Sequence, residues 1–341
     1  MTTEARNARE TTGLVGLDRI REAAALLRAV ATRTPLVPFG LTERRQYLRA
    51  EFLQPVGSFK IRGAYNAIAS LTDEERARGV VTYSSGNHAQ GVARAARLLG
   101  ISAVVVMPEG APAIKAARVA ADGAEIVWVD PSSDVRQHVA EQLATERGLA
   151  IIPPFDDDRI IAGQGTVGLE IVEDLPDVAA ILIPVGGGGL ASGVAAAVRT
   201  LKPNARLIGV EPELAADARD SLAAGRIVAW SSDDVSRTIA DGTRTTALGG
   251  RTFAHLSALL DGIVTVSEAE IAAAVRLIAE ESRLVAEPSG ALGVAALRFR
   301  AGEAGLAGVD GPIVAIVSGG NVDLERYRAY LAARIPGDER P

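Results

Sequence analysis

Residues 179–201 read AAILIPVGGGGLASGVAAAVRTL and contain one strand, one turn and one helix. The apolar run Ala179–Pro184 has the near-continuous hydrophobicity of a strand that is buried on both faces, which is typical of parallel sheets. The glycines that follow end the strand, and the alanine-rich stretch Leu190–Leu201 predicts a helix. A buried strand that leads directly into a helix is the repeating unit of an α/β fold.

The same succession of β-branched runs and amphipathic stretches recurs along the 341-residue chain. We expect further strands at Val80–Tyr83, Ser102–Met107, Glu125–Val129, Arg206–Glu211 and Pro312–Val317. We expect further helices at Leu17–Ala31, Ile61–Leu71, Ala89–Leu99, Ile114–Ala121, Ser133–Arg147, Glu268–Ser282 and Leu324–Ala333. The pattern therefore predicts parallel sheets that are covered by helices on both faces.

Length and composition narrow the class of protein. At ~100–200 residues per domain the length suggests two domains, and the proline-containing segment 152–158 is the best candidate for the crossing between them. The net charge is −6, and the absence of a basic block argues against nucleic-acid binding. No apolar run approaches the ~18–20 residues of a membrane span, and the polar residues 1–10 lead into no signal-like segment, so we expect a cytoplasmic protein.

Three residue types are absent or scarce, which restricts the possible chemistry. The chain has no cysteine, and this removes disulfides, thiolate nucleophiles and cysteine-ligated zinc. Lysine occurs only at Lys60, Lys115 and Lys202, and histidine only at His88, His138 and His255. A Ser-His-Asp triad or a multi-histidine metal site would have to draw on those three histidines.

The segment Gly57–Gly63, GSFKIRG, places one of the rare lysines at the start of a predicted helix. Ser58 is a good N-cap residue, which puts Lys60 in the first helical turn. The positive end of the helix dipole disfavours a charged lysine there and favours the neutral amine that attacks an aldehyde to form a Schiff base. The alternative is a surface lysine whose stem packs on Phe59, but the surrounding motifs favour the reactive lysine.

Two other loops are suited to binding anions. Gly186–Gly189 precede a helix, and four consecutive glycines let several backbone N–H groups turn toward one phosphate. A tight strand-to-helix turn would need only about two glycines, and neither the P-loop ending nor a clean dinucleotide fingerprint is present. The loop Tyr83–Gly91, YSSGNHAQG, offers backbone and side-chain donors that suit a carboxylate, while His88 by itself is more often structural than catalytic.

Six motifs, taken in order, resemble the serine/threonine dehydratase and serine racemase family of fold-type II, tryptophan-synthase-β-like pyridoxal phosphate (PLP) enzymes. These motifs are Ser58-Phe59-Lys60, Ser84-Ser85-Gly86-Asn87-His88, Gly163-Gln164-Gly165-Thr166, Gly186–Gly189, Ala286-Glu287-Pro288-Ser289-Gly290 and Ser318-Gly319-Gly320-Asn321. The resemblance implies two open, mainly parallel twisted sheets. It also implies a large PLP-binding domain, residues 1–72 and 157–341, and a smaller inserted domain with the substrate loop, residues 79–155.

The resemblance also implies a role for each matching residue. Lys60 would hold the cofactor and move the substrate's Cα proton, and Phe59 would lie beside the cofactor ring. The phosphate would rest on Gly186, Gly187, Gly188 and Gly189. The ring's 3-oxygen would accept a hydrogen bond from Asn87, and the pyridine nitrogen would meet Ser318. The substrate carboxylate would be bound by Ser84, Ser85, Gly86 and His88.

A neutral hydroxyl at the pyridine nitrogen draws less negative charge into the ring than a carboxylate would, which favours expulsion of a leaving group from Cβ. The expected reaction is β-elimination of water from a small hydroxy-amino acid such as L-threonine or L-serine, giving a 2-oxo acid and ammonia. The resemblance also implies a divalent-cation site for Mg²⁺ or Ca²⁺ at Glu211, the Ala215 carbonyl and Asp217. The alternative for these carboxylates is an acidic, solvated helix start.

Several alternatives remain open at this stage. Ser85 stands where the racemases have serine, so racemisation of serine or aspartate on the same site is an alternative, as is dehydration of 3-hydroxyaspartate. Pro154-Phe155-Asp156-Asp157 reads like the dehydratase version of its segment. The resemblance implies a homodimer, and we expect no C-terminal regulatory domain.

Two classes outside this family are weaker explanations. A nicotinamide-dependent oxidoreductase would explain the glycine run but leaves Lys60 without a role. A non-catalytic amino-acid-binding protein on the same fold would not need Lys60 either.

Overall fold

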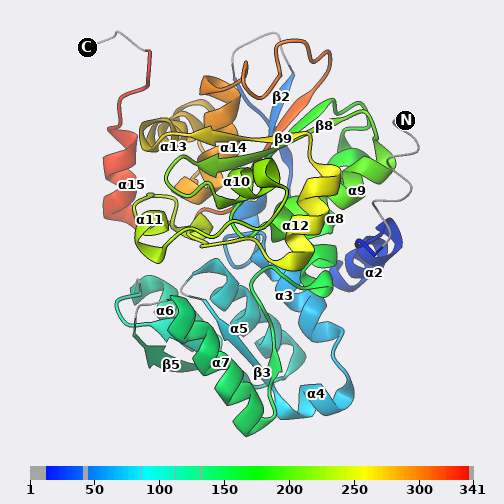
Figure 1. Cartoon of the computed structure of the whole chain (residues 1–341), viewed down its shortest axis with the longest axis vertical. Helices are drawn as coiled ribbons and strands as arrows, with labels where there is room; N and C mark the ends of the chain where they lie inside the picture. Colours follow the sequence, from blue (N-terminus) through cyan, green and yellow to red (C-terminus); the bar gives the residue numbers. More distant parts are fainter. Residues whose placement is uncertain (1–12, 41–44, 85, 112, 131–132, 338–341) are drawn as a thin grey trace.

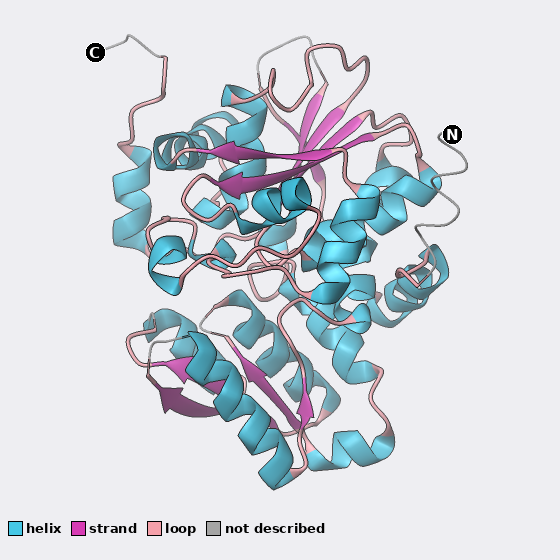
Figure 2. Ribbon diagram, in the orientation of Figure 1, coloured by secondary structure: helices cyan, strands magenta, loops and turns pink. Residues whose placement is uncertain are grey.

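The computed structural model describes residues 13–40, 45–84, 86–111, 113–130 and 133–337. Its strands form two separate sheets, one of six strands and one of four, and helices cover both (Figures 1 and 2). All strands of the smaller sheet lie between residues 80 and 151. The predicted α/β class with open, mainly parallel sheets is confirmed, while the domain limits 1–72, 79–155 and 157–341 stay a prediction.

The larger sheet has the strand order β1-β2-β10-β7-β8-β9. Its strands are β1 (Leu36–Pro38), β2 (Gln46–Ala50), β7 (Ala180–Pro184), β8 (Arg206–Pro212), β9 (Gly262–Val266) and β10 (Ile313–Val317). Only β1 and β2 pair in antiparallel fashion. Side chains alternate along a strand, so Ile181 and Ile183 join one hydrophobic cluster while Ala180 and Leu182 join the other. Both faces of the sheet are therefore buried.

Helices from distant parts of the chain supply these two layers. The cluster on one face includes residues of α2 (Leu17–Leu27), α8 (Asp158–Asp174), α9 (Gly189–Leu201), α10 (Asp217–Ala224) and α12 (Gly250–Leu259). The cluster on the other face includes residues of α13 (Glu268–Ser282), α14 (Pro288–Phe299) and α15 (Leu324–Leu331). The short α11 (Ser232–Ser236) and two 3₁₀ turns, Glu51–Leu53 and Asp241–Thr243, lie in the connections.

The smaller sheet has the order β5-β4-β3-β6, and all its pairs are parallel. Its strands are β3 (Val80–Tyr83), β4 (Ala103–Pro108), β5 (Glu125–Val129) and β6 (Ala150–Ile151). Its helices are α5 (Asn87–Leu99), α6 (Ala113–Ala121) and α7 (Ser133–Arg147). The helices α3 (Lys60–Ala69) and α4 (Asp73–Arg78) lead from the larger sheet into this part of the chain.

Glycines allow α3, α8 and α9 to pack backbone against backbone. A Cβ added to Gly163 on α8 would lie 2.6 Å from the Cα of Gly63 on α3. A Cβ added to Gly193 on α9 would lie 2.4 Å from the backbone nitrogen of Gly165 on α8. Any larger side chain at these positions would push the helices apart. This close packing holds α3, and with it Lys60, against the larger sheet's helical layer.

Some elements differ from the sequence prediction. The strands β1, β2, β6 and β9 and the helices α4, α8, α10, α11, α12 and α14 were not predicted. The first predicted helix, Leu17–Ala31, ends at Leu27, whose carbonyl accepts hydrogen bonds from both Val30 and Ala31 in a closing turn. The last predicted helix, Leu324–Ala333, ends at Leu331.

Candidate active site

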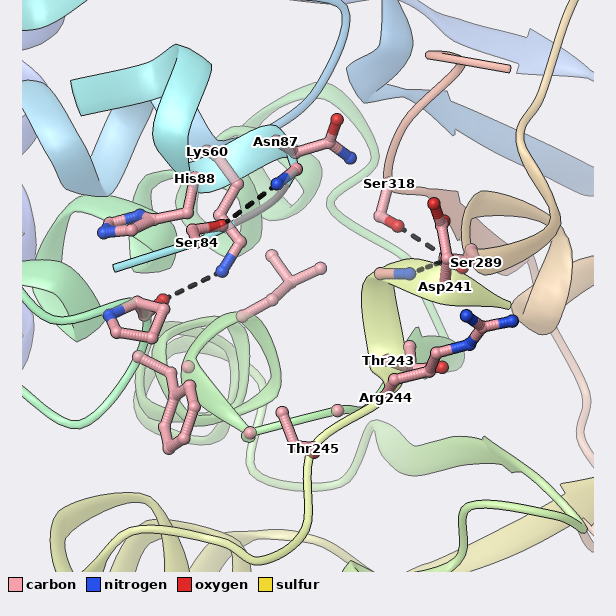
Figure 3. A pocket seen from close by; sticks show the side chains of 18 of the residues that line it. Lys60, Ser84, Asn87, His88, Asp241, Thr243, Arg244, Thr245, Ser289 and Ser318 are labelled. Carbon is pink, nitrogen blue, oxygen red and sulfur yellow. Dashed lines mark hydrogen bonds between the residues drawn. The ribbon is translucent and has the colours of Figure 1, made fainter. Parts of the chain in front are cut away.

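Loops that follow strands of both sheets surround one cavity of about 280 Å³ (Figure 3). The predicted cofactor and substrate residues that line it are Phe59, Lys60, Ser84, Gly86, Asn87, His88, Gly186, Gly187, Gly188, Gly189 and Ser318. Ser85 lies outside the described residues. The loops after β3, β7 and β10 all contribute, as expected for the carboxyl ends of strands in open α/β sheets. The fold thus brings four separate sequence motifs to one place.

Lys60 is the first residue of α3, and its amine faces the cavity (Figure 3). The Nζ atom donates to the carbonyl oxygen of Pro154 at 2.8 Å and lies 5.2 Å from the centre of the Phe59 ring. Burial lowers the pKa of the Lys60 amine from 10.5 to about 8, because the ammonium form loses its hydration. A substantial share of the amine is therefore neutral and nucleophilic near neutral pH.

The predicted N-cap at Ser58 is wrong. Phe59 occupies the N-cap position of α3 without a side-chain cap, and Ser58 instead forms an isolated β-bridge with Gly319. The Ser58 hydroxyl is buried and has no hydrogen-bond partner among the described residues. The Phe59 N–H donates to the Ser318 carbonyl at 3.1 Å. The start of α3 is thus tied to the loop after β10 rather than capped locally.

The glycine loop combines a left-handed turn with close packing. Gly188 has φ +87°, a conformation that favours glycine. A Cβ on Gly187 would lie 2.2 Å from the Phe155 ring, and one on Gly186 would lie 2.9 Å from the Cα of Thr243. The backbone N–H groups of Gly186, Gly187 and Gly188 donate to no other described residue, and α9 begins at the next position. These free donors at a helix N-terminus form an anion cradle.

The loop after β3 begins α5 beside the same cavity. Ser84 accepts a hydrogen bond from the Gly86 N–H at 3.2 Å. His88 is buried, and its Nε2 donates to the Ile152 carbonyl at 3.1 Å. Burial, with a smaller effect from the nearby Lys60 charge, lowers the pKa of His88 to about 3. This imidazole is therefore neutral, and it cannot store a proton at neutral pH.

The Asn87 side chain is held from two sides. Its Nδ2 donates to Glu287 Oε1 at 2.5 Å, and its Oδ1 accepts from Asn321 Nδ2 at 2.9 Å. Burial, with a smaller effect from the Asp241 charge, raises the pKa of Glu287 to about 7, while Lys115 and the Asn87 hydrogen bond act in the opposite direction. The Ser318 hydroxyl, also lining the cavity, donates to the Ser289 carbonyl at 3.5 Å (Figure 3).

Five charged residues of the cavity were not predicted, namely Lys115, Arg136, Asp241, Arg244 and Glu287. Lys115 on α6 pairs with Asp241 at 2.7 Å and so links the small sheet's helices to the 3₁₀ turn Asp241–Thr243. Burial lowers the pKa of Arg136 on α7, and its Nε is buried without a hydrogen-bond partner among the described residues. The scarcity of lysine marked Lys115, and Glu287 stands within a quoted motif, but nothing in the pattern marked Arg136, Asp241 or Arg244.

The predicted cation residues Glu211, Ala215 and Asp217 are not part of the cavity lining. Burial raises the pKa of Asp217 to about 7, and burial together with the Asp217 charge raises that of Glu211 well above its usual value. Both carboxylate oxygens of Asp217 are buried without a hydrogen-bond partner among the described residues. Within that part of the chain, no group of three or more His, Cys, Asp or Glu residues could hold a metal ion.

Comparison with known proteins gives consistent results. Residues 27–319 match the family described as pyridoxal-phosphate dependent enzymes. The chain is 39% identical to the L-threo-3-hydroxyaspartate ammonia-lyase of Saccharomyces cerevisiae, over 93% of this chain and 97% of that protein. It is 43% identical to the L-threonine ammonia-lyase of Thermotoga maritima, over 91% and 77% of the two chains. The structure of maize serine racemase superposes with a TM-score of 0.88 at 39% identity and covers 92% of this chain and 96% of that one.

None of the helices in the described residues has the length and apolar character needed to cross a bilayer. The cavity fits the cofactor of the matched family, since it presents a buried amine of lowered pKa together with a cradle of free N–H groups. Because this fit accompanies a match over most of the length, the chain belongs to the family of pyridoxal-phosphate-dependent enzymes and has their fold-type II architecture.

Proposed function

We propose that this protein is a PLP-dependent ammonia-lyase that removes water from a small hydroxy-amino acid and releases a 2-oxo acid and ammonia. The observation that carries the proposal is the single cavity shared by Lys60, the cradle Gly186–Gly189 and the loop at Ser84. The ammonia-lyase relatives support the reaction type. A silent amino-acid-binding protein would not need a buried lysine of lowered pKa at this position.

When bound, PLP supplies an electron sink that stabilises negative charge at the substrate Cα. Lys60 is the residue suited to accept the Cα proton, because its amine is partly neutral near neutral pH. The N–H groups of Gly186–Gly189 hold the phosphate, and Ser84 with the start of α5 binds the substrate α-carboxylate. The Cα–H and Cβ–O bonds break, the leaving hydroxyl takes up the proton that Lys60 removed from Cα and departs as water, and the released enamine hydrolyses to the 2-oxo acid and ammonia.

The charges in the cavity favour a substrate with a second carboxylate. Lys115 already has a carboxylate partner in Asp241, whereas the buried Nε of Arg136 has no partner among the described residues. A guanidinium nitrogen that is buried without a partner is costly unless an anion joins it. We therefore propose that Arg136 binds the β-carboxylate of a 3-hydroxyaspartate-type substrate, the substrate named for the Saccharomyces cerevisiae relative.

A substrate panel tests both parts of this proposal. Release of 2-oxo acid would be assayed with L-serine, L-threonine and L-threo-3-hydroxyaspartate, with chiral analysis of the remaining amino acid. We expect Arg136→Gln to lower kcat/KM for hydroxyaspartate by ~30- to 1000-fold, since a buried charge pair loses one partner. L-Serine turnover should change little. Arg147→Gln, on the same helix but paired at the surface with Glu125, is the control.

Two results would count against the proposal. If no substrate of the panel gives a 2-oxo acid, the elimination reaction is wrong, and accumulation of the opposite enantiomer would instead favour the racemase. If Arg136→Gln lowers activity equally for serine and hydroxyaspartate, the second carboxylate is not bound there.

We also propose that Glu211, the Ala215 carbonyl and Asp217 hold Mg²⁺ or Ca²⁺. The support is the pair of buried carboxylates, of which Asp217 has no hydrogen-bond donor among the described residues. Hard oxygen ligands of this kind suit either cation, and the ion would stabilise the fold outside the cavity. The homodimer is a proposal that rests on the family resemblance, and sedimentation tests it. The cytoplasmic location is a proposal that rests on the lack of an apolar span or signal-like segment in the sequence, and cell fractionation tests it.

A further inference from the structure

We infer that Arg118, Asn321, Asn87 and Glu287 form a directed hydrogen-bond chain that fixes which end of the Asn87 amide faces the cofactor site. Arg118 Nη1 donates to Asn321 Oδ1, Asn321 Nδ2 donates to Asn87 Oδ1 at 2.9 Å, and Asn87 Nδ2 donates to Glu287 Oε1 at 2.5 Å. Asn321 and Arg118 are thereby positioning residues for Asn87. This inference rests on the proposed PLP site.

The Arg118 end of the hydrogen-bond chain sets its direction. A guanidinium can only donate hydrogen bonds, so Asn321 must present its oxygen to Arg118 and its NH₂ group to the other side. That NH₂ group donates to the Val56 carbonyl at 2.8 Å as well as to Asn87. Because the Asn321 NH₂ group is the donor, Asn87 must present its oxygen to Asn321 and its NH₂ group to Glu287, whose Oε1 accepts. Neither amide can flip without losing several hydrogen bonds.

The backbone packs closely around the side chains of this hydrogen-bond chain. A Cβ on Gly57 would lie 2.3 Å from Asn321 Oδ1, and a Cβ on Gly319 would lie 2.1 Å from Glu287 Oε1. Glu287 is only 2% exposed. The glycines at these two positions are therefore needed to admit the polar side chains. The hydrogen-bond chain is held in place by close packing.

The chain also joins the two halves of the cavity. Asn87 and Arg118 lie on α5 and α6, beside the smaller sheet, while Glu287 precedes α14 and Asn321 follows β10 of the larger sheet. Asn87 lines the cavity, and its NH₂ group keeps a second hydrogen for an acceptor there. The position of α6 thus controls the orientation of a donor in the cofactor site, although Arg118 itself is exposed and does not line the cavity.

Replacement of the donor at the Arg118 end of the hydrogen-bond chain by an acceptor tests the inference. We expect Arg118→Glu, which offers an acceptor where a donor is needed, to weaken PLP binding by ~10-fold, the equivalent of one misdirected hydrogen bond. The absorption band of the bound cofactor should shift with it. Asn321→Asp should have the same effect, because a carboxylate cannot donate to Asn87. Arg118→Lys keeps a donor and should restore both the affinity and the band.

The control is Arg97→Glu, which makes the same charge change on α5 at an exposed arginine paired with Asp122. In the cofactor-free protein, a double-mutant cycle between Arg118→Gln and Asn321→Ala should show a coupling of more than ~2-fold in the unfolding equilibrium constant. If the wild type binds no PLP, the proposed function is refuted. The double-mutant cycle would still test the hydrogen-bond chain, because it is measured without the cofactor. The inference itself is overturned if Arg118→Glu and Asn321→Asp bind PLP like the wild type, if Arg118→Lys behaves like Arg118→Glu, or if the cycle shows no coupling.

Discussion

Substitution of Gly187 by alanine probes how the glycine loop and the lysine are connected. The added Cβ would meet the Phe155 ring at 2.2–2.4 Å, far inside contact distance, so the ring must move. Gly189 also packs closely on Phe155, because even a Cβ added there would lie only 3.1 Å from the Cβ of Phe155. Phe155 follows Pro154, whose carbonyl accepts from Lys60, and both residues line the cavity. The ring is therefore expected to move into the space that the cofactor needs.

The expected cost has two parts. Overpacking of this kind lowers the free energy of unfolding by about 1–3 kcal/mol. Displacement of the ring into the cavity should weaken PLP binding by ~10- to 100-fold, since the cofactor must push it back at a similar cost. The backbone itself is not strained, because Gly187 does not have a positive φ. The Gly187 N–H also remains available, so the loss would come from packing and not from the anion cradle.

Urea denaturation and titration with PLP measure the two effects separately. Gly250→Ala is the matched control, because a Cβ at this exposed position of α12 meets nothing within 4 Å. Gly187→Ala combined with Phe155→Ala should recover much of the PLP affinity. If Gly187→Ala unfolds and binds PLP like the wild type, the reasoning about the Phe155 contact is refuted.

Three further predictions follow from the buried charges. The rate at which cofactor-free protein captures PLP should rise with pH and level off just above the Lys60 pKa of about 8, because only the neutral amine reacts; a rate that keeps rising to about pH 10 would contradict this. Glu51→Gln should lower the free energy of unfolding by about 3–5 kcal/mol, since it leaves the buried Arg62 and Arg49 undercompensated, and an unchanged urea midpoint would refute it. After chelator treatment, Mg²⁺ or Ca²⁺ should raise the melting temperature of the wild type but not of Asp217→Ala; equal responses would remove the cation site.

Much of the fold was predictable because its central strands are apolar over their whole length. β7 and β10 have only buried residues, and the prediction placed both within one residue. β2 was not predicted because it carries a charged residue, Arg49, which is fully buried and forms ion pairs with two carboxylates from α8. α8 was not predicted, and its glycines Gly163, Gly165 and Gly168 are of a type more common in loops than in helices, whereas in three dimensions they are contact points between helices.

The site was predictable where each residue belongs to a compact local motif. Lys60, the glycine run and Asn87 each stand in such a segment, and the fold brings all of them to the same cavity. Arg136 and Asp241 were missed, since their roles depend on contacts between segments far apart in the sequence. The N-cap at Ser58 was wrong for a related reason, because pairing with Gly319 after β10 overrides the local capping preference.

The central claim is that Lys60 holds PLP in this cavity, and the three lysines of the chain allow a direct test. Purified protein would be incubated with PLP, reduced with borohydride, digested and analysed by mass spectrometry. The account predicts one cofactor per chain on the peptide that contains Lys60, with none on Lys115 or Lys202, and loss of the colour in Lys60→Ala. A wild type that takes up no PLP, or takes it up at Lys115 or Lys202 instead, would contradict the account.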